Sequence, residues 1–258
     1  MLSIKRILLP VDFSDRARAA VRYGTAIATR CQSSLILLHV LPAMSVALKC
    51  LGGGGTPVQE VLAHQKDDAE RKLRSFMADE FRGFQVEGIV AEGDPALVIG
   101  DYARSEHVDL IVMSTRGCGV VRRFLLGSVT SRVLHDAPCP VLTAEHDAET
   151  RLDPKWELRE ILCAVNSGST NEEAMRWAGE FASMMGAHVS VVHAASSLNP
   201  QSGSHGFEAH MADSSARIVR AVAQDRSADL VVIGPGSGTG NRYSYAIINE
   251  SPCPVVSV

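Results

Sequence analysis

The N-terminal half of the chain alternates short apolar runs with longer stretches of helical periodicity. The apolar runs have no polar face, which is typical of strands covered on both sides of a parallel sheet. Ser14 is suited to cap the first helix, and the pair Asp94-Pro95 marks the start of another. A strand–helix alternation of this kind implies right-handed crossovers. The pattern predicts strands at 7–12, 34–40, 84–91, 109–114 and 141–143, and helices at 14–30, 58–81, 94–106 and 129–135.

The same pattern starts again after a polar stretch at 145–157, which has the composition of a linker. Four segments of the C-terminal half echo four segments of the N-terminal half, and an internal duplication explains all four. The echoes pair 161–169 with 7–15, 188–194 with 34–40, 228–238 with 108–118, and 251–258 with 137–144.

A glycine-bearing loop lies between the strand at 109–114 and the helix that begins near Ser128. Small residues such as Gly117 and Gly127 let the backbone approach a phosphate, and the helix N-terminus favours negative charge. The hydroxyls of Ser128 and Thr130 add donors at the helix start. The loop therefore indicates an anion site, with a plain strand–loop–helix connection as the alternative.

This stretch resembles the nucleotide-binding signature of the universal stress protein family. That signature is Gly, two residues, Gly, nine residues, then Gly-Ser or Gly-Thr. The chain has Ser114, two residues, Gly117, nine residues, then Gly127-Ser128, so the first glycine is replaced by serine. The Ala-Pro-Cys-Pro-Val that follows at 137–141 matches the family as well. A side chain at 114 could crowd the phosphates, or its hydroxyl could contact them.

The resemblance implies two tandem α/β domains, each a doubly wound, mainly parallel five-stranded sheet of order 3-2-1-4-5. The first would span 1–146 and hold the binding loop, and the second would span 158–258 and be degenerate. Many members of the family bind ATP or AMP. The resemblance places an adenine nucleotide on Pro10, Val11, Asp12, Val40, Met113, Ser114, Arg116, Gly117, Gly127, Ser128, Val129 and Thr130.

Several of these residues have a plainer interpretation. Asp12 ends the first strand, where it could accept hydrogen bonds from adenine or ribose, or could serve as a helix-capping charge. Val40 would act through its backbone, or would be a core side chain only. Arg116 could bond a phosphate, or could be a solvated surface arginine. His39 lies in an apolar strand and is expected to be a core histidine. No residues form a convincing catalytic set or metal site.

The second copy departs from the first where the binding loop should be. Its corresponding loop, from Gly234 to Asn241, is six residues shorter than that from Ser114 to Gly127. It also has too few residues for a counterpart of the helix at 58–81, and 207–211 is expected to form a short third strand. Asn166 stands where Asp12 stands in the first copy. Alignment of the two Pro-Cys-Pro-Val segments places Asn241-Arg242 opposite Gly127-Ser128.

Charge, apolar runs and cysteine spacing argue against several classes of protein. The net charge of −4 argues against a general binder of nucleic acid or membrane surfaces. The longest apolar runs are too short for a spanning helix, and no signal peptide is expected. The six cysteines form no CxxC pair, so buried thiols in a cytoplasmic protein are expected. The Gly52–Thr56 run lacks the Gly-Lys-Ser/Thr of a P-loop and is expected to be a flexible loop.

Three functions fit these observations. The first is a stress-response regulatory or sensor protein that binds ATP or AMP in its N-terminal domain. The second is a slow ATP hydrolase, which would need Mg²⁺ and an oriented water. The third is an interaction scaffold without a ligand.

The last strand of each copy, at 140–143 and 254–258, would lie at a sheet edge. We expect these edges to pair within one chain, and whole chains to form a homodimer, because a sheet face that lacks a covering helix tends to find a partner.

Overall fold

The computed structural model of the chain describes residues 2–42, 58–81, 83–115, 126–144, 157–165, 171–193, 205–234 and 240–258. The strands are β1 Arg6–Pro10, β2 Ser34–Pro42, β3 Val86–Gly93, β4 Leu110–Ser114, β5 Val141–Ala144, β6 Glu160–Val165, β7 His188–His193, β8 Leu230–Ile233 and β9 Val255–Ser257. The helices are α1 Asp15–Cys31, α3 Val58–Glu80, α4 Pro95–Ser105, α5 Ser128–Asp136, α6 Asn171–Met185, α7 His205–Asp225 and α8 Gly240–Glu250.

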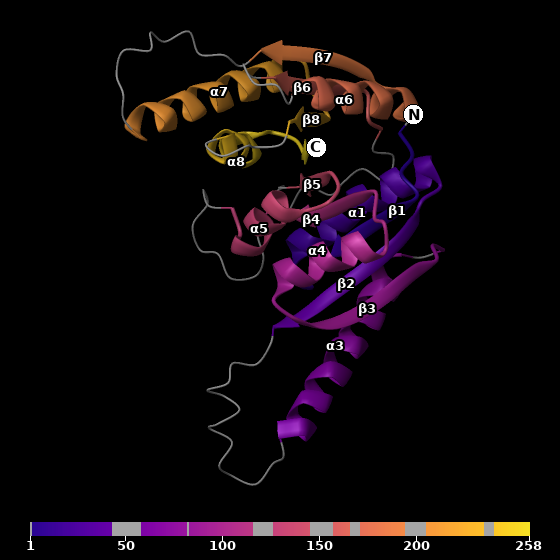
Figure 1. Ribbon diagram of the computed structural model, residues 1–258. Coiled ribbons are helices and arrows are strands. Elements are labelled where there is room, and N and C mark those ends of the chain that lie inside the picture. The colour runs from indigo at the N-terminus through magenta and orange to yellow at the C-terminus, as the bar shows by residue number, and fades with distance from the viewer. Residues whose placement is uncertain are drawn as a thin grey trace.

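One sheet runs through the whole molecule (Figure 1). Its strand order is β3-β2-β1-β4-β5-β9-β8-β6-β7, and β3 and β7 form its two outer edges. Within each half the strands are parallel, and the N-terminal half has the predicted order 3-2-1-4-5. The two sheets that the sequence predicts are therefore continuous with each other, because their last strands pair.

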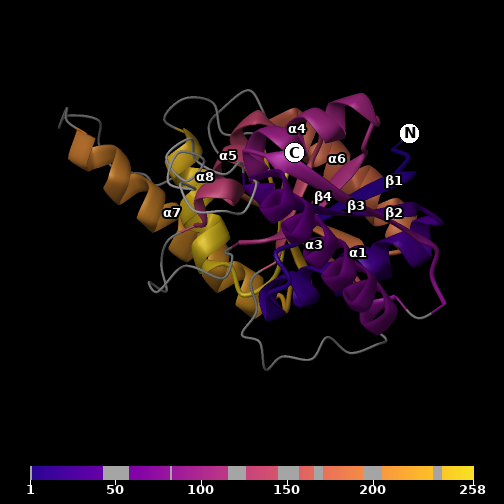
Figure 2. The same cartoon turned by 90° about the horizontal axis from the view of Figure 1, so that it is seen from below.

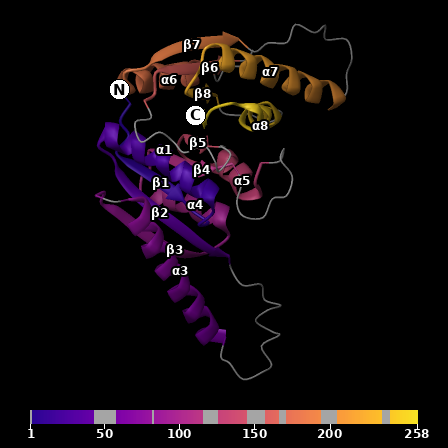
Figure 3. The ribbon, with the colours of Figure 1, turned by 180° about the vertical axis from the view of Figure 1, so that it is seen from behind.

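Helices cover both faces of this sheet. Figure 3 shows α1, α3 and α6. The core on their face of the sheet joins β-strand side chains to these helices and contains buried residues of both halves. On the other face, one core cluster lies under α4 and α5 and another under α7 and α8. Both faces of the central strands are thus buried, which explains why the sequence shows apolar runs there instead of alternation.

The seam between the halves is the antiparallel pair of β5 and β9. Val141 lies opposite Ser257, Leu142 opposite Val256 and Thr143 opposite Val255. The hydroxyl of Thr143 also donates to the carbonyl oxygen of Val255 at 3.2 Å. The predicted pairing of the two edge strands within one chain is therefore confirmed.

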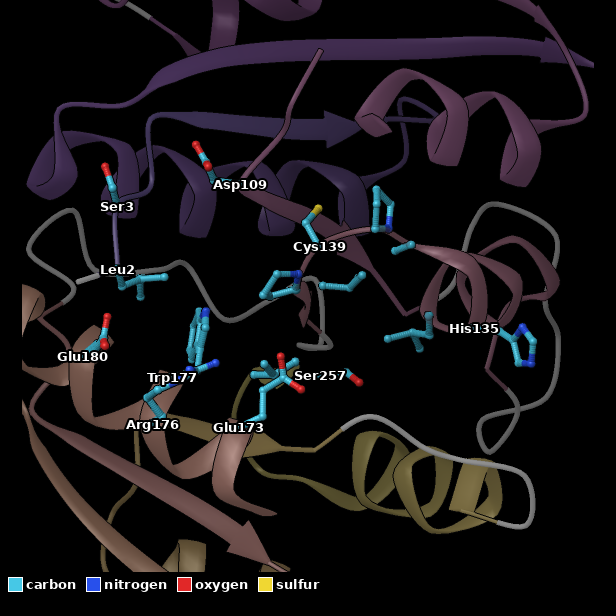
Figure 4. Close-up of a pocket in the computed structure, with 16 residues that line it drawn as sticks. Leu2, Ser3, Asp109, His135, Cys139, Glu173, Arg176, Trp177, Glu180 and Ser257 are labelled. Atoms are coloured by element: carbon cyan, nitrogen blue, oxygen red, sulfur yellow. The ribbon is translucent and has the colours of Figure 1, made fainter. Parts of the chain in front are cut away.

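Each half also places an aromatic side chain of its first helix beside the Pro-Cys-Pro turn of the other half. Trp177 of α6 and Cys139 line one seam cavity of about 570 Å³ (Figure 4). Tyr23 of α1 lies near Cys253, and burial, with Cys253 and Asp229 as smaller causes, raises the pKa of its phenol. Side chains of both halves therefore meet at the seam, in addition to the strand pair.

The C-terminal half differs from its prediction in one element. Residues 207–211 belong to α7, and no third strand follows β7 in the part of this half that the structure describes. These five residues lie near the start of a 21-residue helix, and five residues are too few to display its 3.6-residue period. The N-terminal part of α7 extends beyond the sheet (Figures 1 and 2).

Four cysteines lie in the described residues, and all four are free thiols. Burial raises the pKa of Cys139 and Cys253 to about 12 and that of Cys163 to about 11, so these thiols stay protonated at neutral pH. Cys50 and Cys118 fall outside the described residues.

Candidate functional site

A cavity of about 510 Å³ opens where β1, β2 and β4 end and where α4 and α5 begin. In a doubly wound sheet, the crevice at the carboxyl ends of the strands is where ligands bind, at the point where the strand order reverses. β1 is that point here, because it pairs with β2 on one side and β4 on the other.

All ten predicted site residues that the structure describes line this cavity. They come from four segments that are distant in sequence and adjacent in the fold. They are Pro10, Val11, Asp12, Val40, Met113, Ser114, Gly127, Ser128, Val129 and Thr130. The other two, Arg116 and Gly117, lie outside the described residues.

The loop after β1 is held by a chain of hydrogen bonds. Asp12 Oδ1 accepts from the backbone N–H of Ser14 at 3.1 Å and from its hydroxyl at 2.6 Å. Ser14 Oγ in turn accepts from the N–H of Ala17 at 3.2 Å, which makes Ser14 the predicted N-cap of α1. Asp12 thus has a capping-type contact, and the cavity also reaches its side chain.

His39 and Phe13 fix the backbone on either side of Asp12. Because a carbonyl oxygen can only accept, His39 Nδ1 must donate the 2.8 Å hydrogen bond that joins it to Val11 O. The His39 ring lies against Phe13, with ring centroids 4.3 Å apart. Phe13 has a φ of 64°, a strained backbone state that such packing can maintain.

The start of α5 presents backbone donors to the cavity. The first hydrogen bond within this helix runs from the N–H of Ser131 to the carbonyl oxygen of Gly127, at 2.9 Å. The N–H groups of Ser128, Val129 and Thr130 therefore precede the intrahelical ladder, and the helix dipole adds positive potential there. Gly127 is the N-cap and has no side chain to occupy the space in front of these donors. The arrangement suits an anion.

Two contacts hold α5 in this position. Thr130 is buried, and its hydroxyl donates to the carbonyl oxygen of Ser114 at 3.0 Å, which ties α5 to the end of β4. Arg132 donates to Asp94, the N-cap of α4, at 2.7 Å. This bond to Arg132, with the N–H of Leu97 as a smaller cause, lowers the pKa of Asp94.

The Thr130 hydroxyl therefore has a structural contact, and its predicted contact with a ligand stays a prediction. We expect Thr130→Val, which keeps the shape of the side chain, to lower the free energy of unfolding by about 1 to 2 kcal/mol, because the Ser114 carbonyl loses a buried donor. Urea denaturation monitored by circular dichroism measures this change. Thr29→Val on the exposed part of α1 is the matched control, and an equal loss in both variants would contradict the assignment.

Five further residues line the cavity that the sequence did not indicate: Leu38, His39, Pro42, Pro95 and Ile99. Their only sequence signal is their position next to a predicted strand end or helix start. Asp12 is the one carboxylate among the described lining residues.

In the described part of the chain, no group of His, Cys, Asp or Glu side chains is arranged to hold a metal ion. No helix in that part is sufficiently long and apolar to span a membrane.

This geometry defines a class: α/β proteins with an anion-binding helix start at the reversal point of a parallel sheet. Residues 3–144 match the model of the universal stress protein family. That match covers more than half of the chain, which therefore belongs to the universal stress protein family.

Individual relatives agree with this assignment. Universal stress protein MJ0531 of Methanocaldococcus jannaschii is 32% identical over 141 residues, which are 55% of this chain and 82% of the relative. A universal stress protein of Thermus aquaticus is 36% identical over 140 residues, 54% of this chain and 96% of the relative. The crystal structure of a universal stress protein from Archaeoglobus fulgidus covers 99% of this chain and 96% of its own, with a TM-score of 0.69 and 19% identity, and shows the same fold.

Proposed function

We propose that the chain is a stress-response regulatory or sensor protein that binds one adenine nucleotide, ATP or AMP, in the cavity of its N-terminal half. One observation carries the proposal: the N-terminus of α5 faces a cavity that ten predicted residues line. Residues 1–146 and 158–258 would then be two copies of one domain. The strand order β2-β1-β4-β5 and its repeat as β7-β6-β8-β9 support this division.

Each part of the nucleotide would contact different residues of the cavity. The N–H groups at the start of α5 bind the phosphates, because they provide donors and positive potential in one place. Asp12 accepts hydrogen bonds from the ribose or the adenine, and the backbone of Val40 contacts the adenine. The size of the cavity, about 510 Å³, is within the range of small-molecule sites.

The helix that binds phosphate also contacts the other half of the chain. Ser131 Oγ donates to Tyr245 Oη of α8 at 2.9 Å, and the Tyr245 hydroxyl donates to the carbonyl oxygen of Ser131 at 3.0 Å. Nucleotide at the start of α5 would therefore act on a helix that is bonded across the seam. This contact favours a regulatory role.

A slow ATP hydrolase is the rival function, with Mg²⁺ held by the phosphates. His39 and Asp12 are the cavity-lining groups that could act as a general base. His39 donates from Nδ1 to Val11 O, which leaves Nε2 as its acceptor nitrogen, and Asp12 Oδ1 is bonded to Ser14. Phosphate release measured over hours, with Gly127→Val as the inactive control, separates binding from hydrolysis.

The proposal also includes a cytoplasmic location, which the free, buried thiols of Cys163 and Cys253 support.

We expect one nucleotide per chain, because the second copy has replaced Gly127-Ser128 by Asn241-Arg242 and has a shorter loop. Mass spectrometry of the ligand released from denatured protein identifies the nucleotide, and calorimetric titration of stripped protein counts the sites. Two equivalent sites per chain would contradict the stoichiometry. If neither ATP nor AMP binds at millimolar concentration, the nucleotide proposal is wrong and the function as a scaffold without a ligand is favoured.

A further inference from the structure

The outer strand of the C-terminal half carries an apolar face that its counterpart in the N-terminal half keeps buried. In register, Val189 and Val191 of β7 lie beside Ile161 and Cys163 of β6. Leu35 and Leu37 of β2 lie in the same way beside Ile7 and Leu9 of β1, and all four of these side chains are buried. Val189 is 37% exposed and Val191 is 56% exposed.

The difference has a structural cause. In the N-terminal half, Leu73 and Phe76 of α3 pack in the same core cluster as Leu35 and Leu37, and β3 pairs with the outer side of β2. In the described part of the C-terminal half, β7 is followed in sequence by a single helix, α7, whose buried residues belong to the cluster on the opposite face. Val189 and Val191 are therefore without the cover that their counterparts have.

The backbone of β7 is also available for pairing. The N–H of His188 donates to Arg159 O of the neighbouring chain segment at 2.8 Å. Successive residues of a strand direct their backbone polar groups to opposite sides, so those of Val189 and Val191 point away from β6. Among the residues that the structure describes, β7 is the last strand of the sheet on this side. Its free edge thus combines open hydrogen-bonding groups with exposed valines.

The opposite edge of the sheet is protected against pairing. β3 contains Glu87 and Glu92, and it ends at Gly93 with a φ of 146°. Charges and irregular backbone are the usual devices that prevent edge-to-edge association. β7, with the sequence HVSVVH, has no Asp, Glu, Lys or Arg.

We propose that a second copy of the chain docks on β7, so that the two β7 strands pair antiparallel about a two-fold axis at Ser190. In this register Val189 lies opposite the partner's Val191 and exchanges two backbone hydrogen bonds with it, and Val191 does the same with the partner's Val189. The four valines then lie together on one face of the sheet. The two Ser190 residues form the central pair without backbone hydrogen bonds.

Symmetry favours this pairing over the others. Two β7 edges make a self-complementary interface that closes as a dimer, whereas β7 on β3 would leave a free edge at each end and continue as a fibre. The chain already joins its own halves by an antiparallel pair of corresponding strands, β5 with β9. The dimer extends the same sheet at its unprotected end.

The first test is the mass in solution. Light scattering coupled to size exclusion should give twice the chain mass of 27.6 kDa at micromolar concentration. Val191→Lys should give the single-chain mass, because it places two charges at the centre of the interface. Leu97→Lys is the matched control, since Leu97 of α4 is 55% exposed on another surface and its variant should remain dimeric. A monomeric wild type, or a dimeric Val191→Lys variant, would overturn the proposal.

The second test reports the register and does not depend on disrupting the interface. The Cα atoms of a central pair without hydrogen bonds lie about 4.5 Å apart, which a disulfide can span. Ser190→Cys should therefore form a disulfide-linked dimer under mild oxidation, seen on a non-reducing gel. Wild type and Glu87→Cys, on the β3 edge, should remain single chains. No linked dimer from Ser190→Cys, or equal linkage from Glu87→Cys, would count against pairing at β7.

Discussion

Replacement of Gly127 by valine should weaken nucleotide binding by about tenfold or more, which corresponds to about 1.4 kcal/mol or more. Gly127 is buried at the start of α5, and a valine side chain would occupy the space where phosphate approaches the N–H groups of Ser128 and Val129. The backbone itself tolerates the change, because a φ of −61° and a ψ of 144° are ordinary values for valine. Calorimetric titration with ATP measures the loss.

The matched control is Gly179→Val. Gly179 is an exposed residue of α6, and a Cβ atom added there would meet nothing within 4 Å. This variant should bind nucleotide as the wild type does. An unchanged dissociation constant for Gly127→Val, in protein whose circular dichroism spectrum is native, would refute the assignment of the site.

Truncation of Phe181 to alanine should lower the free energy of unfolding by about 3 to 5 kcal/mol. Phe181 is fully buried in α6, and its ring stacks on Trp177 with centroids 4.6 Å apart. The large loss is expected because the side chain belongs to the core cluster that contains residues of both halves. Urea denaturation gives the value. Met175→Ala on the same helix, where the side chain is 39% exposed, should cost less than about 1 kcal/mol.

The shared core also predicts how the chain unfolds. Of the two tryptophans, Trp177 lies in the C-terminal half and Trp156 in the linker that precedes it, whereas circular dichroism reports helices of both halves. The two signals should change together in one transition, and Phe181→Ala should shift both equally. A fluorescence transition that moves away from the circular dichroism transition would show that the halves unfold separately.

Local patterns were sufficient to predict the N-terminal half. Its strands are buried on both faces, so apolar runs such as 34–40 stand out, and short polar residues such as Ser14 and Asp94 cap helices through contacts with their own neighbours. The cavity was predictable for the same reason. Parallel strands end at one edge of the sheet, so Asp12 and Gly127 must lie near each other if their strands are neighbours.

Features that depend on tertiary contacts could not be predicted in this way. Pro95 and Ile99 line the cavity because α4 packs beside the end of β2, and their side chains carry no chemical signal of that role. Residues 207–211 lie near the start of α7, and a segment of five residues is too short to display the period of a helix. His39 was expected to be a core histidine, and its contact with Val11 O shows that it also shapes the mouth of the cavity.

Because β5 and β9 belong to one chain, dilution of the protein does not separate them. When two such edges belong to separate molecules, their association depends on protein concentration. In this chain a covalent connection holds them at a fixed, high effective concentration, so the pair persists in dilute solution. The connection also prevents either half from exchanging its neighbour for the corresponding half of another chain. Every site with the Gly127 loop therefore keeps the same unlike half beside it for the lifetime of the chain.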